Sequence, residues 1–440
     1  MAAASQTVVL DNGGSTIKAG IVRTDLGVDD EVRLIPNAVV RSKGDKATFV
    51  GHEIGRCKDY TTLHYRLPFE KGYLVDWDAQ KAIWDGLFSS EVLSVNASES
   101  SLLITEPYFN LPNIQDIYDQ FVFEEYEFLS YHRCTPAAMI PYGQLFAVEG
   151  LQPPECSLIV DSGFSFTHVV PIINNQIQWH AVKRLDVGGK LLTNQLKEVI
   201  SYRQWNMMDE TYIVNHVKES CCYVSSNFFA DLETCRLKAK KSEIAQEYIL
   251  PNYEPGHELA PMDQVLVMEN ERFTIPELLF RPDDIGLEQS GLSSMIAASI
   301  SLLPEDLQGM FWANIGLIGG NTIFPGFHER LMSELRSLAP VEYDIQIYRS
   351  KDAITEAYRS SLEFVRSADF ATHFVTRAEY LESGSHAIRR KFGHWQSGNS
   401  NKSGERVMKS SSSADVVPQL SKKPSRSRIR TAPSTSSRRR

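Results

Sequence analysis

Short apolar runs that end in turn sequences alternate with amphipathic stretches along most of the chain. The first run, Thr7–Leu10, enters a glycine-containing turn at Asp11–Gly14, after which a second apolar strand begins at Ile17. This pattern predicts a β-hairpin. About 150 residues later, Ser157–Val160 enters the turn Asp161–Ser165 in the same way, and another apolar strand follows.

A repeat at this distance predicts two similar lobes, each opening with a hairpin whose turn presents backbone N–H groups. Two such turns facing each other across a cleft could bind a polyphosphate, with Asp11 and Asp161 holding a hydrated Mg²⁺ and Lys18 adding positive charge. One turn alone is better explained as an ordinary hairpin turn. The pair at matching strand ends is what favours a binding site.

Amphipathic helices are predicted between the strands. Over residues 77–88, Trp77, Trp84 and Leu87 fall on one helical face, as packing against a core requires. Further helices are predicted over 191–200, 209–223 and 327–338, and buried strands over 102–105 and 315–318. The last strand runs into Gly319–Gly320, where either a flat ligand or phosphate approaches the backbone or the chain makes a tight packing turn.

The composition is that of a globular protein with room for two or three cores, since 42% of its 440 residues are hydrophobic and 23% are charged. No apolar run is long enough for a membrane helix, and residues 1–6 lack signal-peptide features, so we expect neither a membrane span nor secretion. The six cysteines have no paired C-x-x-C spacing. They therefore indicate packing in a reducing compartment rather than a zinc site or a disulfide framework.

Charge divides the chain near residue 396. Residues 396–440 carry 11 lysines and arginines against two acidic residues, a net charge of +9, whereas the remainder carries −19. An acidic body is unlike a DNA-binding domain. The serine-rich tail is predicted to be disordered, and its segment Lys422–Arg430 is typical of a nuclear import signal or a nucleic-acid patch, with a solvated charge run as the alternative. We therefore expect a nuclear protein that also occurs in the cytoplasm.

In order and spacing, these motifs resemble those of actin and the actin-related proteins from about Thr7 to about Trp395, and in detail those of a nuclear actin-related branch. The matching motifs are Val9–Gly13, Thr105–Pro107, Val122–Glu124, Asp161–Gly163 with Thr167–His168, Arg184–Gly189, Lys218–Glu219, Asn270–Phe273 with Pro276–Glu277, and Gly319–Gly326. Tyr202–Arg203, Met208–Thr211 and the basic ending Ile388–Phe392 are similar to that branch.

The resemblance implies an α/β actin-like fold, in which two duplicated ribonuclease-H-like lobes surround a nucleotide cleft, followed by a disordered basic tail. The implied parts are a first lobe at 1–145 with a small inserted subdomain at 36–69, a second lobe at 146–350 with an inserted subdomain at 190–270, a return to the first lobe at 351–395, and the tail at 396–440.

ATP or ADP with Mg²⁺ is the cofactor that the resemblance implies. The residues implied to contact the phosphates are Asp11, Gly13, Gly14, Ser15, Lys18, Asp161 and Gly163. The residues implied to line the nucleoside are Gly189, Lys218, Glu219, Gly319, Gly320 and Phe324. Asp11 and Asp161 would hold the metal through water.

Several positions depart from the actin pattern. Gly14 replaces a serine that reads the terminal phosphate, and Phe164 and Ser165 replace an acidic residue and a glycine. Pro136 stands where actin has the glutamine that positions the attacking water, and proline has no side-chain donor or acceptor. Residues 357–361 lack two glycines of the family, which adds side chains to that segment. We expect nucleotide binding to be optional or structural, without catalytic residues or significant turnover.

Filament formation is also not expected, because Ala38–Thr48 has only 11 residues and is shorter than the loop with which actin contacts its neighbour. The segment Met207–Asn270 also departs from actin, which indicates either a dedicated partner surface or a divergent loop.

By resemblance, the protein is a scaffold subunit of a chromatin-remodelling complex that exchanges a Z-type histone variant, affecting transcription and silencing. Its partners would be a motor ATPase, other subunits and nucleosomes, whose basic histones suit an acidic body, with tail contact to DNA as a further interaction. The alternatives are an independent actin-fold ATPase and a filament-forming cytoskeletal protein.

Overall fold

The computed structural model describes residues 6–23, 32–150, 152–237, 243–251, 264–367 and 370–392. The chain divides into Met1–Trp395 and Gln396–Arg440, and all of the described residues belong to the first unit. The tail with its candidate import signal therefore lies outside the described residues, as do residues 238–242 and 252–263 of the divergent segment.

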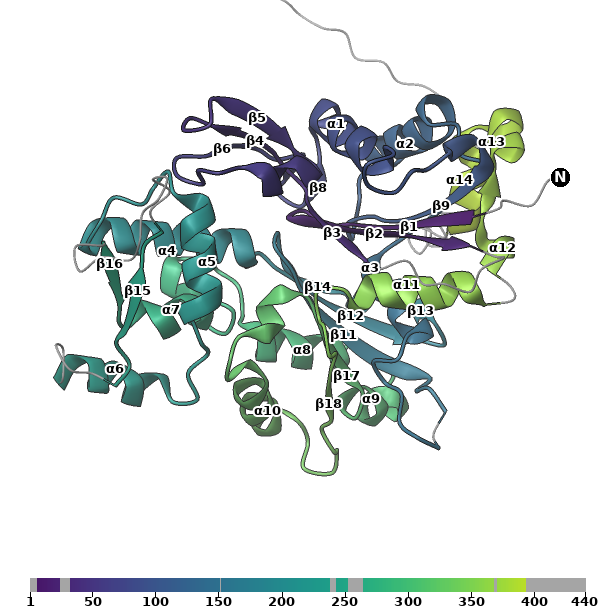
Figure 1. Cartoon of the computed structure of the whole chain (residues 1–440). Helices are drawn as coiled ribbons and strands as arrows, with labels where there is room; N and C mark the ends of the chain where they lie inside the picture. The colour runs from purple at the N-terminus through teal and green to yellow at the C-terminus, as the bar shows by residue number, and fades with distance from the viewer. Residues whose placement is uncertain are drawn as a thin grey trace, which may run out of the picture. The chain divides into compact units, whose positions relative to one another are not determined.

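Two sheets with the same strand order form the centre of the fold (Figure 1). The first sheet runs β3 (Arg33–Pro36), β2 (Thr16–Arg23), β1 (Gln6–Asn12), β9 (Ser100–Thr105), β10 (Ser130–Cys134) and β19 (Val375–Thr376). The second runs β14 (Lys183–Leu185), β12 (Thr167–Ile173), β11 (Cys156–Ser162), β17 (Ile315–Ile318) and β18 (Ile347–Arg349), with β13 (Gln176–Ile177) also paired to β12.

Strand direction repeats as well as strand order. In each sheet the hairpin and a third strand are antiparallel, and two further strands join the hairpin in parallel. The predicted duplication and the α/β class are thus confirmed. The second hairpin strand of the repeat begins at Thr167 rather than at Phe166, because Phe166 belongs to the turn.

The predicted helices are present, and three of the predicted elements have the predicted bounds. These are α1 (Trp77–Phe88), α10 (Phe327–Leu338) and β17. The other predicted helices are α4 (Gly189–Arg203) and α5 (Thr211–Cys221). The remaining α-helices are α2 (Pro112–Gln120), α3 (Pro136–Met139), α6 (Phe228–Leu237), α7 (Glu271–Glu277), α8 (Leu292–Ile300), α9 (Glu305–Trp312), α11 (Glu356–Arg366), α12 (Phe370–His373), α13 (Arg377–Ser383) and α14 (Ser385–Phe392).

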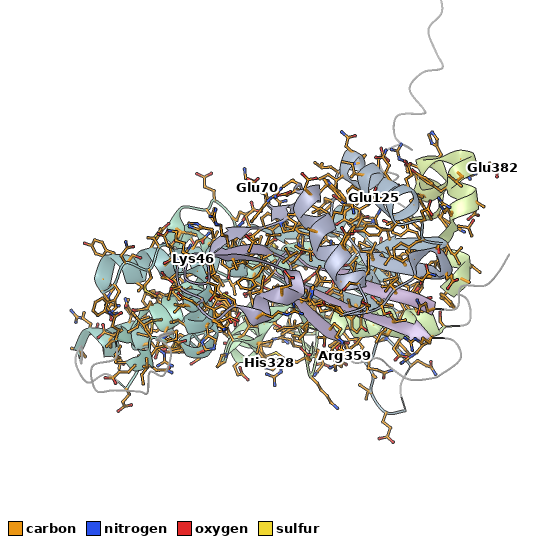
Figure 2. All side chains as sticks on the ribbon, turned by 45° about the horizontal axis from the view of Figure 1, so that its top comes forward. Lys46, Glu70, Glu125, His328, Arg359 and Glu382 are labelled. Atoms are coloured by element: carbon orange, nitrogen blue, oxygen red, sulfur yellow. The ribbon has the colours of Figure 1, made fainter. Side chains whose placement is uncertain are left out.

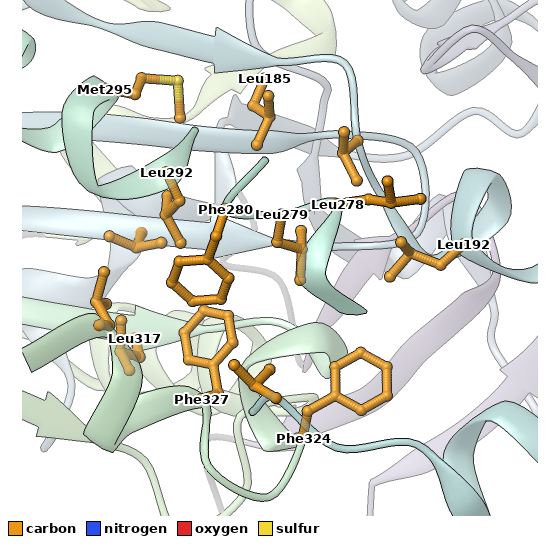
Figure 3. Packing of buried hydrophobic residues seen from close by; sticks show 14 of the residues in the cluster. Leu185, Leu192, Leu278, Leu279, Phe280, Leu292, Met295, Leu317, Phe324 and Phe327 are labelled. Atoms are coloured by element: carbon orange, nitrogen blue, oxygen red, sulfur yellow. The ribbon is translucent and has the colours of Figure 1, made fainter. Parts of the chain in front are cut away.

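Each sheet packs its helices into a core of its own. In the first core, Trp84 and Leu87 of α1 are fully buried, as the helical pattern predicts. In the second, the rings of Phe280 and Phe327 lie 5.7 Å apart between centroids, and Phe324 packs on the same cluster (Figure 3). Because these cores fix the ends of the strands, they also fix the turns that follow those ends.

Three small sheets complete the structure. The first consists of β5 (Ala47–Val50), β4 (Val39–Ser42) and β6 (His64–Arg66), and the segment noted for its shortness folds as its β4–β5 hairpin. The second is β7 (Phe69–Glu70) with β8 (Tyr73–Leu74), and the third is β15 (Gln246–Ile249) with β16 (Val265–Met268). Of the helices in the described residues, none is both long and apolar enough to cross a membrane.

Candidate nucleotide site

A cavity of about 670 Å³ lies where the two hairpin turns meet. All thirteen residues that the sequence implies for nucleotide contact line it. They are Asp11, Gly13, Gly14, Ser15, Lys18, Asp161, Gly163, Gly189, Lys218, Glu219, Gly319, Gly320 and Phe324. The fold thus brings segments that are hundreds of residues apart to one cavity.

The first turn is anchored by its own aspartate. Asp11 lies opposite Lys18 in the β1–β2 register, and their charged groups are 3.1 Å apart. The hydroxyl of Thr105, at the end of the neighbouring β9, donates to Asp11 Oδ1 at 2.7 Å. Both carboxylate oxygens of Asp11 therefore have partners within the protein.

The second turn repeats this arrangement with different chemistry. Asp161 lies opposite His168 in the β11–β12 register, so an imidazole takes the place of a lysine. Burial lowers the pKa of His168 to about 3, which keeps the imidazole neutral. Burial also raises the pKa of Asp161 to about 6, and the nearby negative charge of Asp11 acts in the same direction.

Tyr108 joins the lobes next to this aspartate. Its hydroxyl donates to Asp161 Oδ2 at 2.8 Å and accepts from the backbone N–H of Ala137 at 3.1 Å. This hydrogen bond favours the ionised form of Asp161 and so opposes the rise of its pKa. A residue after β9 of the first sheet thereby fixes the aspartate of the second.

The nucleoside side of the cavity combines bare backbone with a buried cation. Gly319 has φ +89°, and a Cβ there would lie 2.3 Å from Ser162 O, so glycine is required. At Gly320, by contrast, a Cβ would have a single atom near it, at 4.0 Å. Lys218 donates to Gly189 O, Thr193 Oγ1 and Asn215 Oδ1, and burial lowers the pKa of its ammonium group.

Only part of this cavity fits a nucleoside triphosphate with Mg²⁺. The glycine backbone and the apolar surface of Phe324 suit a base and a ribose, which Gly320 leaves room for. Asp11 and Asp161 lie in one cavity, but no group of three His, Cys, Asp or Glu side chains in the described ranges could hold a metal ion directly. Contact through water is therefore the mode that suits these two carboxylates.

Two departures from the actin pattern have different positions in the structure. Pro136 lines the cavity as the first residue of α3, whereas its neighbour Thr135 lines a second pocket of about 220 Å³. Of residues 357–361, Ala357 lines the cavity, and Arg359 lies at the surface (Figure 2). The side chains gained in that segment thus point largely away from the cleft, because α11 places them in the core or in solvent.

A second contact joins segments on the two sides of the cleft. The carboxylate of Glu210, just before α5, accepts from the backbone N–H and the hydroxyl of Thr62 at 2.9 and 3.1 Å. Beside it, the rings of Tyr60 and Tyr212 stack with centroids 4.3 Å apart. Sequence reasoning missed this contact and that of Tyr108, although Tyr108 directly follows the matched motif Thr105–Pro107.

Comparison with known proteins agrees with this architecture. The family model described as Actin matches residues 2–393. The chain belongs to the actin family. Within this family it is 51% identical over 416 residues to the actin-like protein ARP6 of Cryptococcus neoformans, covering 88% of this chain and 84% of the relative. It is 34% identical to actin-related protein 6 of Drosophila melanogaster and 37% identical to that of Arabidopsis thaliana.

These two alignments cover 88% and 89% of this actin-family chain and the full length of each relative. The resemblance to this branch of the actin-related proteins, implied by Tyr202–Arg203, Met208–Thr211 and the basic ending Ile388–Phe392, is thereby confirmed.

Proposed function

We propose that this protein is a non-polymerising nuclear scaffold subunit of an ATP-dependent chromatin-remodelling complex, which exchanges a Z-type histone variant into nucleosomes. The proposal is supported by its relatives, which are named actin-like protein ARP6 or actin-related protein 6 and whose alignments cover 88% or 89% of this chain. A separate motor subunit hydrolyses ATP, while this chain contributes assembly and nucleosome contact.

The observation that carries the non-catalytic part of the proposal is the lining of the cavity. Pro136, which the resemblance matches to the water-positioning glutamine of actin, lines the cavity, and no glutamine is among the described residues that line it. Since orienting the nucleophile is a main protein contribution to phosphoryl transfer, nucleotide bound here is structural and is not turned over.

The distribution of charge along the chain supports the proposed partners. The body, with its net charge of −19, suits basic histones, and the tail, with +9, suits nuclear import or contact with DNA. We propose a nuclear location with a cytoplasmic pool. DNA contact through the tail would weaken steeply with rising salt, because several phosphates would be neutralised, and a flat salt response would remove this contact.

Purification from nuclei tests the proposal. The full chain, tagged at its N-terminus, is isolated at moderate salt, sized, and its partners are identified by mass spectrometry. We expect a large assembly that contains a remodelling motor and histones. A single species of the size of this chain, or a complex with actin alone, would instead support the alternative that the protein is an independent ATPase.

Two further measurements address the alternatives. Turnover of ATP at an actin-like rate by the purified chain, abolished in Asp161→Ala, would refute the non-catalytic role. Sedimentation of concentrated protein in an ultracentrifuge would instead support filament formation, which we expect to be absent.

A further inference from the structure

The hairpin of β15 and β16 forms a two-stranded sheet beside α4 and α5, within the segment that departs from actin (Figure 1). On its inner face, Leu266 and Met268 are fully buried, and Tyr248 packs against the same core. On its outer face, Glu247 and Ile249 are exposed. Because an isolated two-stranded sheet is only marginally stable in water, this one depends on its inner packing and on what its two edges bind.

The register of the hairpin determines which backbone groups face each edge. The N–H of Leu250 donates to Gln264 O at 2.9 Å, so these two residues form a hydrogen-bonded pair directly after β15 and before β16. Hydrogen-bonded and non-hydrogen-bonded pairs alternate along antiparallel strands. At the odd-numbered residues of both strands, the backbone N–H and C=O groups therefore point away from the partner strand.

The edge of β16 is already occupied by side chains. The side-chain amide of Gln204 donates to Val267 O at 2.6 Å and accepts from Val267 N–H at 2.9 Å. The indole N–H of Trp205 donates to Val265 O at 3.4 Å. These hydrogen bonds agree with the outward direction of the odd-numbered groups, and they close this edge to another strand.

The edge of β15 has no such cover among the described residues. The sheet has two strands, and in the described ranges the backbone N–H and C=O groups of Glu247 and Ile249 have no hydrogen-bond partner. β15 contains neither proline nor lysine, and its register with β16 has no bulge, so the usual devices that protect an exposed edge are missing from this strand. An unpaired edge of this kind is a template for an additional strand.

The side chains beside this edge indicate which segment fits. Glu247 and Ile249 lie two residues apart on the outer face, where Ile249 is 50% exposed and Glu247 has no ion-pair partner in the part of the chain that the structure describes. Neighbouring strands are stabilised where apolar side chains or opposite charges lie side by side. A complementary strand therefore carries a basic and an apolar residue two positions apart.

We infer that the β15 edge docks an extended segment of a partner protein, which adds a third strand and places a lysine or arginine beside Glu247 and an apolar residue beside Ile249. The net charge of −19 on the chain before residue 396 also favours a basic segment. Main-chain hydrogen bonds would supply affinity, and the two side-chain contacts would supply selectivity. The inference rests on the proposed scaffold role, because it requires a protein partner, and it specifies the surface and the kind of segment.

Photo-crosslinking of the full chain in intact nuclei tests the inference. The photoreactive residue p-benzoylphenylalanine replaces Ile249, and the crosslinked peptides are sequenced by mass spectrometry. The same replacement at Leu381, which is 66% exposed on α13, is the control for unspecific crosslinks. We expect position 249, and not position 381, to crosslink to one segment of another protein that has a basic and an apolar residue two positions apart.

Variants at Glu247 separate backbone pairing from charge. Glu247→Pro removes the outward N–H and puts a ring in the path of the added strand, while the even-numbered residues keep their bonds to β16. We expect this variant to lower the crosslink yield from position 249 by about ten-fold or more. Glu247→Lys should lower the yield by a smaller factor through charge alone, and Glu247→Gln, which keeps the N–H and the shape of the side chain, should lower it least.

Slow amide exchange at Tyr248 and Leu250 establishes that the hairpin is folded in each variant. Glu247→Lys keeps every backbone group, so it decides the question if the proline disturbs the hairpin.

Four results would overturn the inference. They are no crosslink from position 249, a crosslink from it to another part of the same chain, a crosslinked segment without the expected pattern, and a yield that neither Glu247→Pro nor Glu247→Lys lowers. These outcomes are separate from those of the nuclear purification. A segment that fits would support docking even if no remodelling motor is purified, and a remodelling assembly without the crosslink would keep the proposed function and remove this inference.

Discussion

Replacing Tyr108 by phenylalanine removes one hydroxyl that serves both lobes. The change leaves the Asp161 carboxylate without its donor at 2.8 Å and the N–H of the fully buried Ala137 without its acceptor at 3.1 Å. A hydrogen bond to a charged group contributes about 1.5–3 kcal/mol, and a buried unsatisfied N–H costs about 1–3 kcal/mol. We therefore expect the free energy of unfolding to fall by about 2–4 kcal/mol.

The loss should depend on pH. The Tyr108 hydroxyl lowers the pKa of Asp161, which burial otherwise raises, so the variant's Asp161 binds its proton more tightly in the folded state. Stability gained by protonation is lost as pH rises through the folded-state pKa. The variant should therefore be more destabilised at pH 8 than at pH 5.

Urea unfolding at the two pH values, followed by tryptophan fluorescence and circular dichroism, measures this difference, and coincident transitions establish that one free energy describes it. Tyr131→Phe is the matched control, because Tyr131 is fully buried and its hydroxyl interacts with Arg133 of the same strand, β10, rather than with both lobes. A loss in Tyr108→Phe no larger than in the control, or one independent of pH, would refute the assignment.

Three further changes probe the cavity. Asp161→Asn should have a higher free energy of unfolding than the wild type, because the wild type must keep an ionised carboxylate buried above the folded-state pKa of about 6. The difference should grow as the pH rises toward about 6 and then stay constant at roughly 3 kcal/mol. An equal difference at low and at neutral pH in urea unfolding would contradict this. Glu210→Gln should weaken the hydrogen bonds between residue 210 and Thr62 by about 1 kcal/mol. Amide hydrogen exchange in the sheet of β4, β5 and β6 should then become faster. Unchanged exchange would show that the contact does not restrain that sheet. Gly319→Ala should lower the free energy of unfolding by about 3–4 kcal/mol in the same assay, and Gly286→Ala should lower it by about 1 kcal/mol. Both glycines have positive φ, but only the methyl group at position 319 would meet backbone, at 2.3 Å. Equal losses would show that the backbone conformation alone causes the destabilisation.

The local pattern of apolar and polar residues was sufficient to predict the helix and the two hairpins that position the candidate site. The bounds of α1 follow from apolar residues at helical spacing and from Asp76, whose side chain accepts from the N–H of Ala79 at the first turn. The two hairpins follow from apolar strands that end in glycine-containing turns. Because both hairpins open equivalent sheets, Asp11 and Asp161 reach the same cavity, as their positions in the repeat predict.

Contacts between distant segments could not be predicted in this way. Tyr108 and Asp161 are 53 residues apart, and Thr62 and Glu210 are 148 apart, so no local period relates them. The sequence also showed that Phe164 replaces an acidic residue, but the direction of its ring depends on how the start of α4 holds the turn, where Lys190 N–H donates to Phe164 O at 2.9 Å. Side-chain pairs of this kind are fixed only by the packed fold.

The same contacts bear on what nucleotide can do to this protein. A ligand shifts a conformational equilibrium only by its difference in affinity for the two states. The Tyr108–Asp161 and Thr62–Glu210 pairs join the two sides of the cleft through protein atoms alone. A bound nucleotide can therefore change the arrangement of the lobes only through contacts that it makes in one arrangement and not in the other. An arrangement of the lobes that protein contacts hold in place would suit the scaffold role proposed above.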